Sequence, residues 1–114
     1  MPIQGKKYSN TQENVDKAPQ SHGVYQFYDG ETITYIGRAS GTDVTIRSRL
    51  QAHKRGDEGA CTQAATDYKR EETEAAISRE EALLIEYANA TGASFLGATA
   101  SCPEDARAAG SARG

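Results

Sequence analysis

The stretch GVYQFYDGETITYIG, residues 23–37, decides the fold. Residues that favour β-strands lie on both sides of Asp29-Gly30, a dipeptide typical of tight hairpin turns. Two such runs joined by a short turn predict an antiparallel hairpin. The hairpin would carry a Gly-Val-Tyr motif at one end and a Tyr-Ile-Gly motif at the other.

The hairpin predicts which side chains share a face of the sheet. Successive side chains of a strand point to opposite faces. We therefore expect Tyr25 and Phe27 on one face of the first strand, and Ile33 and Tyr35 on one face of the second. The pairing should bring Tyr25 and Tyr35 opposite or diagonal to each other.

Two helices are predicted further along the chain. The first covers residues 44–55, with Asp43 as its N-cap and Gly56 as its C-terminal stop. The second covers residues 79–90, because Ser78 opens a capping-box motif before an apolar run. Between them, the charged segment 67–73 is expected to form a polar edge strand, although its charge leaves a helix open.

The order of these elements predicts an α+β class, with a β-β-α-β-α core. A three-stranded antiparallel sheet would be flanked by helices. Residues 1–20 are polar and lack periodicity, so we expect a flexible arm with one turn near residues 10–14. Residues 21–96 would form the domain, and the Ala- and Gly-rich residues 97–114 a mobile tail.

The composition indicates a polar chain. Hydrophobic residues make up 37% of the 114 residues, charged residues 25%, and the mean hydropathy is −0.70. There is no apolar run of the roughly 20 residues that a membrane span needs, and no apolar core of a secretory signal. Cys61 and Cys102 lack metal-site spacing and are expected to be reduced thiols in a cytoplasmic protein.

The charge distribution is uneven. The net charge of −3 argues against a protein coated with nucleic acid on every side. A local basic face is still predicted, because the middle of the chain is rich in cations. These cations are Arg38, Arg47, Arg49, His53, Lys54 and Arg55.

A few residues combine into one chemistry. Tyr25 and Tyr35 are expected to share a face, and Arg49 and His53 stand at i and i+4 on one side of a helix. Glu86 interrupts the apolar run LLIEY. Phosphodiester hydrolysis would use all of them, because it needs a cation at the phosphate, a base for water and a hard oxygen ligand for a metal.

The segment from residue 23 to about residue 87 resembles the GIY-YIG nuclease family. Four motifs occur in the expected order, and together they are much more specific than any one of them. The motifs are GVY at 23–25, YIG at 35–37, IRSRLQAH at 46–53 with Arg49 at the arginine position, and EALLIE ending at Glu86.

The resemblance implies a divalent-metal-dependent DNA endonuclease. It implies that Glu86 holds one Mg²⁺ or Mn²⁺ ion and that Arg49 clamps the phosphate. Either tyrosine could help to deprotonate the attacking water, and we favour Tyr25 as the base with Tyr35 as a phosphate or water contact. His53 would relay that proton or bind phosphate.

The resemblance also implies contacts with DNA, and the sequence departs from the family at one position. Arg38 is assigned to the DNA phosphates. The same role is expected for Arg47, Lys54 and Arg55, with the alternative that these three side chains only face solvent. Ala98 stands where the family has a supporting asparagine. The alternative is therefore a DNA-binding module with weakened catalysis. Because the chain leaves no room for a sequence-reading domain, a homodimer or a separate specificity partner is expected.

Overall fold

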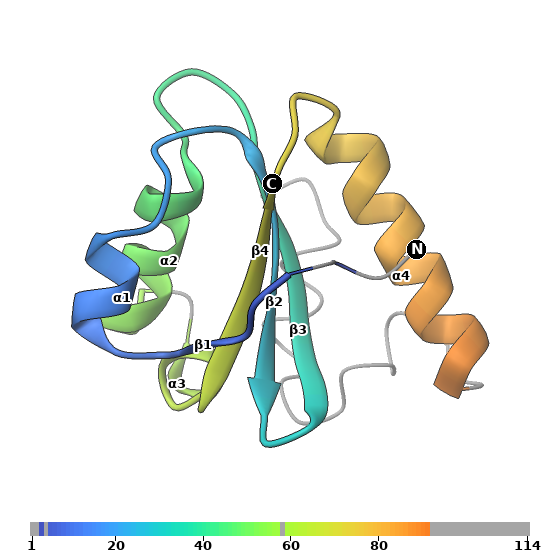
Figure 1. Ribbon diagram of the computed structural model, residues 1–114, viewed down its shortest axis with the longest axis horizontal. Helices are drawn as coiled ribbons and strands as arrows, with labels where there is room; N and C mark the ends of the chain where they lie inside the picture. The colour runs from blue at the N-terminus through green and yellow to red at the C-terminus, as the bar shows by residue number, and fades with distance from the viewer. Residues whose placement is uncertain (1–2, 4, 58, 92–114) are drawn as a thin grey trace.

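The computed structural model describes residues 3, 5–57 and 59–91. Its strands and helices are mixed along the chain (Figure 1). The elements are β1 (Tyr8–Ser9), α1 (Gln12–Asp16), β2 (Gly23–Asp29), β3 (Thr32–Ala39), α2 (Ile46–Arg55), α3 (Ala60–Gln63), β4 (Asp67–Glu72) and α4 (Ala76–Thr91).

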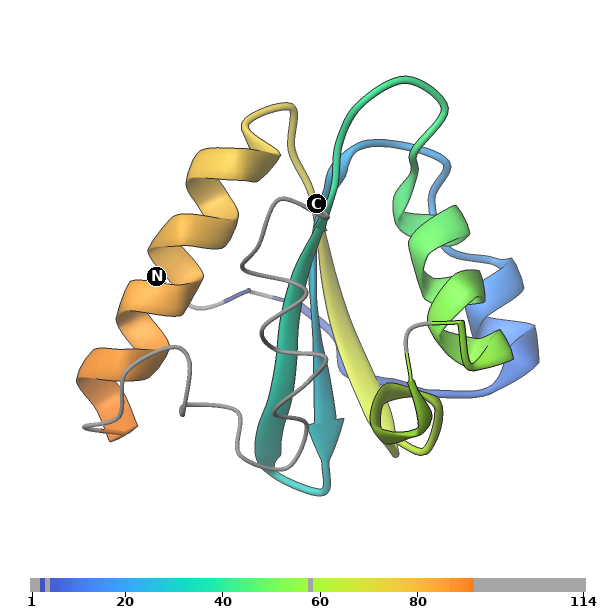
Figure 2. The ribbon, with the colours of Figure 1, turned by 180° about the vertical axis from the view of Figure 1, so that it is seen from behind.

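The fold is a sheet between two helical layers. The four strands pair antiparallel in the order β1-β4-β2-β3. Helices α1 and α2 cover one face of the sheet, and α4 covers the other (Figures 1 and 2). The α+β class is confirmed, whereas the expected three-stranded sheet is wrong, because β1 adds a fourth strand.

The added strand comes from the segment expected to be a flexible arm. Tyr8 and Ser9 pair with β4, and α1 follows near the predicted turn. Val15 and Ala18 are fully buried in the core, which explains why this polar segment packs against the domain. As a result the prediction of β4 as a strand was right, but β4 is not an edge at Asp67 and Tyr68, where β1 pairs with it.

Both long helices begin elsewhere than predicted. Thr45, not Asp43, caps α2, and its hydroxyl and that of Ser48 form a reciprocal capping box. The predicted stop at Gly56 is confirmed, since this residue ends α2 in the left-handed conformation with φ 86°. Helix α4 begins at Ala76, ahead of the predicted start at residue 79. The Ser78 hydroxyl donates to a carbonyl of the first turn and caps nothing.

The β2–β3 hairpin contains a bulge that changes one predicted face. Phe27 pairs with Tyr35 and Tyr28 pairs with Ile33, so Thr34 is an extra residue on β3. Tyr35 therefore packs on the α2 side and Ile33 on the α4 side. The expectation that they share a face is wrong for this reason.

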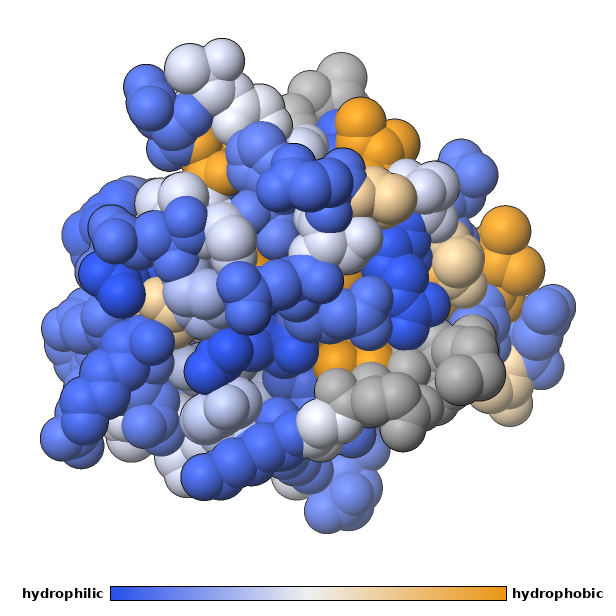
Figure 3. Space-filling view, turned by 45° about the horizontal axis from the view of Figure 1, so that its top comes forward, coloured by the Kyte–Doolittle hydropathy of each residue, from blue (hydrophilic) through white to orange (hydrophobic). Residues whose placement is uncertain are grey.

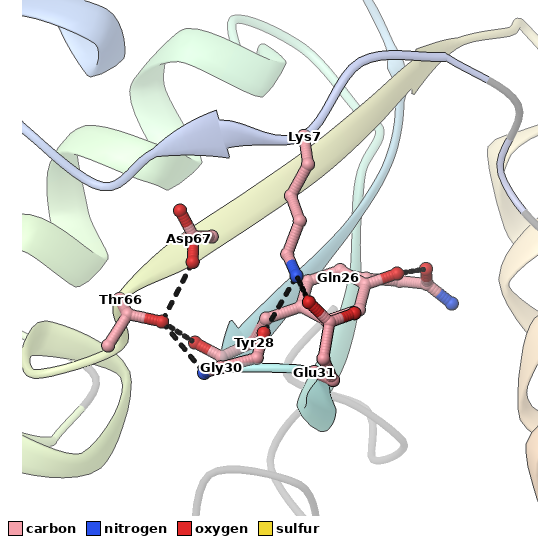
Figure 4. Close-up of polar contacts among 7 residues, drawn as sticks. All are labelled: Lys7, Gln26, Tyr28, Gly30, Glu31, Thr66 and Asp67. Atoms are coloured by element: carbon pink, nitrogen blue, oxygen red, sulfur yellow. Dashed lines mark hydrogen bonds and ion pairs between the residues drawn. The ribbon is translucent and has the colours of Figure 1, made fainter.

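The hairpin turn is fixed by two segments that are distant from it in the sequence (Figure 4). The Lys7 ammonium donates to the Gly30 carbonyl at 2.7 Å and lies 4.6 Å from the centre of the Tyr28 ring. On the other side, the Thr66 hydroxyl accepts a hydrogen bond from the Gly30 N–H at 2.9 Å. Gly30 has φ 66°, which favours glycine at this position.

The surface is largely polar. The face in Figure 3 is mostly hydrophilic with separate hydrophobic patches. Among the described residues, the large exposed apolar side chains are Ile77 and Ile85 on α4. None of the described helices is both long and apolar enough to cross a bilayer. Cys61 is disulfide-bonded, so the prediction of a reduced thiol at this position is wrong. Cys102 and the predicted tail, 97–114, lie outside the described residues.

Candidate functional site

Three of the predicted site residues meet beneath α2. The rings of Tyr25 and Tyr35 stack with centroids 6.2 Å apart and planes 15° apart. The His53 ring stands edge-on to both, at 5.4 Å from Tyr25 and 4.8 Å from Tyr35. We call these three residues the tyrosine–histidine cluster. The predicted diagonal pairing of the two tyrosines is confirmed, because Tyr25 pairs with Gly37.

The cluster is closed and hydrogen-bonded. Tyr25 and Tyr35 are each 1% exposed and His53 is fully buried. The Tyr25 hydroxyl lies 3.0 Å from Nε2 of His53, and Nδ1 of the same ring lies 2.8 Å from the hydroxyl of Thr62 on α3. The cluster is thus part of a chain of polar groups inside the core.

The motif glycines are required by close approach. The Tyr25 ring crosses the backbone of β3 at Gly37, where a β-carbon would lie 2.6 Å from the ring. At Gly23 a β-carbon would collide with the Glu71 carbonyl and would lie 2.6 Å from the Ile46 side chain. At Gly23 the absence of a side chain therefore lets the neighbouring strand approach closely. At Gly37 it leaves room for the Tyr25 ring against the backbone of β3.

Arg49 lies one helical turn before His53 on α2. Its side chain is partly buried. Residues four apart lie on the same side of a helix, so the guanidinium belongs to the layer that covers the cluster. The joint action of Arg49 with the two tyrosines stays a prediction.

Glu86 lies in the other layer. It is partly buried on α4 and lines a hollow of about 280 Å³ between α4 and the hairpin. Glu31, Gln26 and Thr32 also line this hollow and supply oxygen atoms. Oxygen donors suit Mg²⁺, but across the described residues no three His, Cys, Asp or Glu side chains are placed to hold a metal ion.

The residues therefore do not fit the single cation-and-phosphate site expected from the sequence. The tyrosine–histidine cluster packs with α2, whereas Glu86 faces the opposite side of the sheet with Leu83 and Ile33. The structure brings together both tyrosines and His53 beneath the helix of Arg49, and it does not bring Glu86 to them.

Besides Arg49, three basic residues of α2 make contacts within the domain. Arg47 donates to the Ala18 carbonyl at 2.7 Å, and Lys54 donates to the Asn10 carbonyl at 2.9 Å. Both bonds attach the N-terminal segment to α2. Arg55 pairs with Asp57 at 2.9 Å, with both side chains more than half exposed.

Arg38 does not lie with them. It pairs with Glu80 of α4 at 2.7 Å, and the two side chains are 17% and 5% exposed. Desolvation raises the pKa of Glu80, although the neighbouring Arg38 guanidinium opposes this effect. The second carboxylate oxygen of Glu80 is buried without a hydrogen-bond partner. Arg38 thus holds a buried carboxylate beneath α4.

Sequence reasoning missed two of these residues. Thr62 contacts His53 but lies in a stretch of small residues without periodicity. Glu80 lies on a predicted helix, but the apolar pattern gave no reason to separate it from its exposed neighbour Glu81. The pairing of Arg38 with Glu80 depends on the packing of β3 against α4, which no local pattern contains.

Comparisons with models of protein families, with curated proteins and with solved structures find no match. The GIY-YIG resemblance therefore stays a prediction based on the residues themselves.

Proposed function

We propose that the chain is a GIY-YIG-type DNA endonuclease that hydrolyses phosphodiester bonds with Mg²⁺ or Mn²⁺. The observation that supports it is the stacked pair of motif tyrosines on one face, with His53 bonded to Tyr25 beneath the helix of Arg49. Phenol and imidazole groups in direct contact are groups that general acid–base chemistry uses.

The chemistry would be divided among these side chains. A phenol has a pKa of about 10 and stays protonated at neutral pH, so Tyr25 needs a proton acceptor before it can act as a base. His53 is placed to be that acceptor. Arg49 would offset the charge that grows on the phosphate oxygens. Glu86 is the expected metal ligand, but no step is assigned to it because it faces the other side of the sheet.

A second candidate is a DNA-binding module of the same type with weakened catalysis. Two observations favour it: the near-complete burial of both phenols, and the position of Glu86 across the sheet. Binding would then depend on the cations of α2, of which Arg55 is the exposed one. Either function places the protein with DNA, in the cytoplasm, with a second copy or a partner that supplies specificity.

Plasmid nicking separates the two candidates. Purified protein is incubated with supercoiled plasmid and Mg²⁺ or Mn²⁺, and retardation of a labelled duplex is measured at low salt. The variants are Arg49→Ala and Glu86→Ala, with Glu81→Ala as the matched control because Glu81 is an exposed glutamate of the same helix.

Three outcomes are distinct. Nicking that is lost in Arg49→Ala and Glu86→Ala but kept in Glu81→Ala supports the endonuclease. Salt-sensitive retardation without nicking supports the binding module. Neither nicking nor retardation rejects both candidates.

A further inference from the structure

The His53 ring has a hydroxyl at each nitrogen. Tyr25 lies 3.0 Å from Nε2 and Thr62 lies 2.8 Å from Nδ1. Both Thr62 and His53 are fully buried. A neutral imidazole has one N–H donor and one bare nitrogen, so the proton arrangement decides what His53 can do for Tyr25.

Elementary acidity favours one arrangement. A phenol, with a pKa of about 10, is a much stronger acid than an aliphatic alcohol, so it is the better hydrogen-bond donor. An aliphatic hydroxyl oxygen is the better acceptor, because its lone pairs are not shared with a ring. Tyr25 is therefore expected to donate to Nε2, while the Nδ1–H donates to Thr62.

Thr62 is also held in place. It lies on α3, which follows α2 directly in the chain. The Asn10 amide donates to the Ala65 carbonyl at 3.0 Å and to the Thr62 carbonyl at 3.5 Å. The N-terminal segment thus fixes the backbone that carries the Thr62 hydroxyl.

We propose that Thr62 is a positioning residue, which keeps the His53 proton on Nδ1 so that Nε2 is free to take the proton of Tyr25. In this step the O–H bond of Tyr25 breaks and an N–H bond forms at Nε2. The products are a phenolate and an imidazolium, which still donates from Nδ1 to Thr62. The catalytic consequence rests on the proposed nuclease function, but the proton arrangement does not.

The arrangement can be read without DNA. The chain has two histidines, so the ring nitrogens of ¹⁵N-histidine-labelled protein give two sets of signals. We expect neutral His53 with a protonated Nδ1 and a bare Nε2. In Thr62→Val the Nδ1–H loses its acceptor, so the proton should move to Nε2; Thr62→Ser should restore the original arrangement.

A buried threonine away from the ring is the matched control. The Thr34 hydroxyl donates to the Phe27 carbonyl of the hairpin, so Thr34→Val should leave the His53 nitrogens unchanged. Wild-type His53 protonated at Nε2 would overturn the proposal, and so would a Thr62→Val spectrum identical to wild type. The first of these readings needs no variant and holds even if Thr62→Val does not fold.

Activity then tests the consequence. If the wild-type protein nicks DNA, Thr62→Val should be about 100-fold slower while Thr62→Ser stays close to wild type. An unchanged rate in Thr62→Val rejects the positioning role and leaves the nuclease intact. Absence of nicking in wild type, with the expected His53 nitrogens, rejects the nuclease and leaves the proton arrangement intact.

Discussion

The two faces of the sheet bury different kinds of polar group. On the α2 face, the phenol of Tyr25, the ring of His53 and the hydroxyl of Thr62 form a chain of hydrogen bonds. On the α4 face, a charged pair is buried, formed by Arg38 and Glu80.

This difference arises within a single hairpin. Residues that alternate along β2 and β3 go to opposite faces, so one motif supplies Tyr35 to the α2 side and Ile36 to the α4 side. Hydroxyl and imidazole groups can each donate and accept a proton, whereas a buried charge depends strictly on its partner. The α2 face is thus suited to chemistry, and the α4 face to holding a helix in place.

The largest effect is expected on the α4 face. Arg38→Met leaves the Glu80 carboxylate buried without its cation, and this should lower the free energy of unfolding by about 3–5 kcal/mol. Urea denaturation measures the loss. Arg55→Met removes an exposed pair and should cost no more than about 1 kcal/mol. Equal losses in the two variants would contradict a stabilising role for the buried pair.

On the α2 face, the sharpest test is Gly37→Ala. The added methyl group would meet the Tyr25 ring at 2.6 Å, so the ring or the strand must move, at an expected cost of about 1–3 kcal/mol. Gly30→Asn is the control, because nothing lies near a β-carbon there and asparagine tolerates the left-handed backbone. Thermal unfolding compares them; an unchanged Gly37→Ala midpoint would show that the ring is loosely packed.

The salt dependence of DNA binding should also distinguish the α2 face from the α4 face. If DNA lies against α2, Arg55→Ala should reduce the slope of log affinity against log salt by about one. Arg79→Ala, on α4, removes a cation that is paired with Glu71 at 2.7 Å and should leave the slope unchanged. Fluorescence anisotropy across a salt series measures both. A larger change for Arg79→Ala would move the binding face to α4.

The smallest effect concerns His22, which connects the loops that lead to the two helical layers. Its ring nitrogens lie 3.0 Å from the Glu74 carboxylate and 3.0 Å from the Gly41 carbonyl. Both partners are acceptors, so both bonds form only when the ring is protonated. The bond to Glu74, followed by that to Gly41, raises the pKa of His22 above 6.5.

A raised pKa stabilises the folded protein at low pH. The contribution of His22 is complete below pH 6.5 and is lost as the pH rises through the higher pKa of the folded state. Urea denaturation of wild type and His22→Gln across this range should therefore show a small difference that disappears at alkaline pH. A difference that grows with pH would contradict the assignment. The raised pKa of Glu80 also makes the stability depend on pH, but it does so equally in wild type and in His22→Gln, so it cancels in the difference between them.

Sequence reasoning succeeded where the determinants are local. Asp29-Gly30, the strand-forming runs and Gly56 each act within a few residues, and the hairpin and the end of α2 were predicted correctly. It failed where distant segments compete. Val15 is the one buried apolar residue in α1. A single apolar position forms no periodic pattern from which packing could be predicted. The bulge at Thr34 adds a residue to β3, so the side chains before and after it lie on opposite faces of the sheet. The prediction had assumed strict alternation along the strand.

The candidate site divides in the same way. The meeting of Tyr25 and Tyr35 follows from the pairing of adjacent strands, so it could be predicted. The positions of Thr62 and Glu86 depend on which face each following helix covers, which the order of elements does not determine. Strand pairing therefore predicted that Tyr25 and Tyr35 meet, but the order of motifs along the chain did not predict that Glu86 lies beyond the sheet.

The short strand β1 has a consequence for how copies of the chain meet one another. It pairs with β4 only at Tyr68 and Asp67, so among the described strands none covers the outer side of residues 69–72. That uncovered length reads Lys-Arg-Glu-Glu, and charged side chains discourage a foreign strand from adding to an open edge. The domain thus covers one end of this strand with its own N-terminal segment and protects the rest with charged side chains.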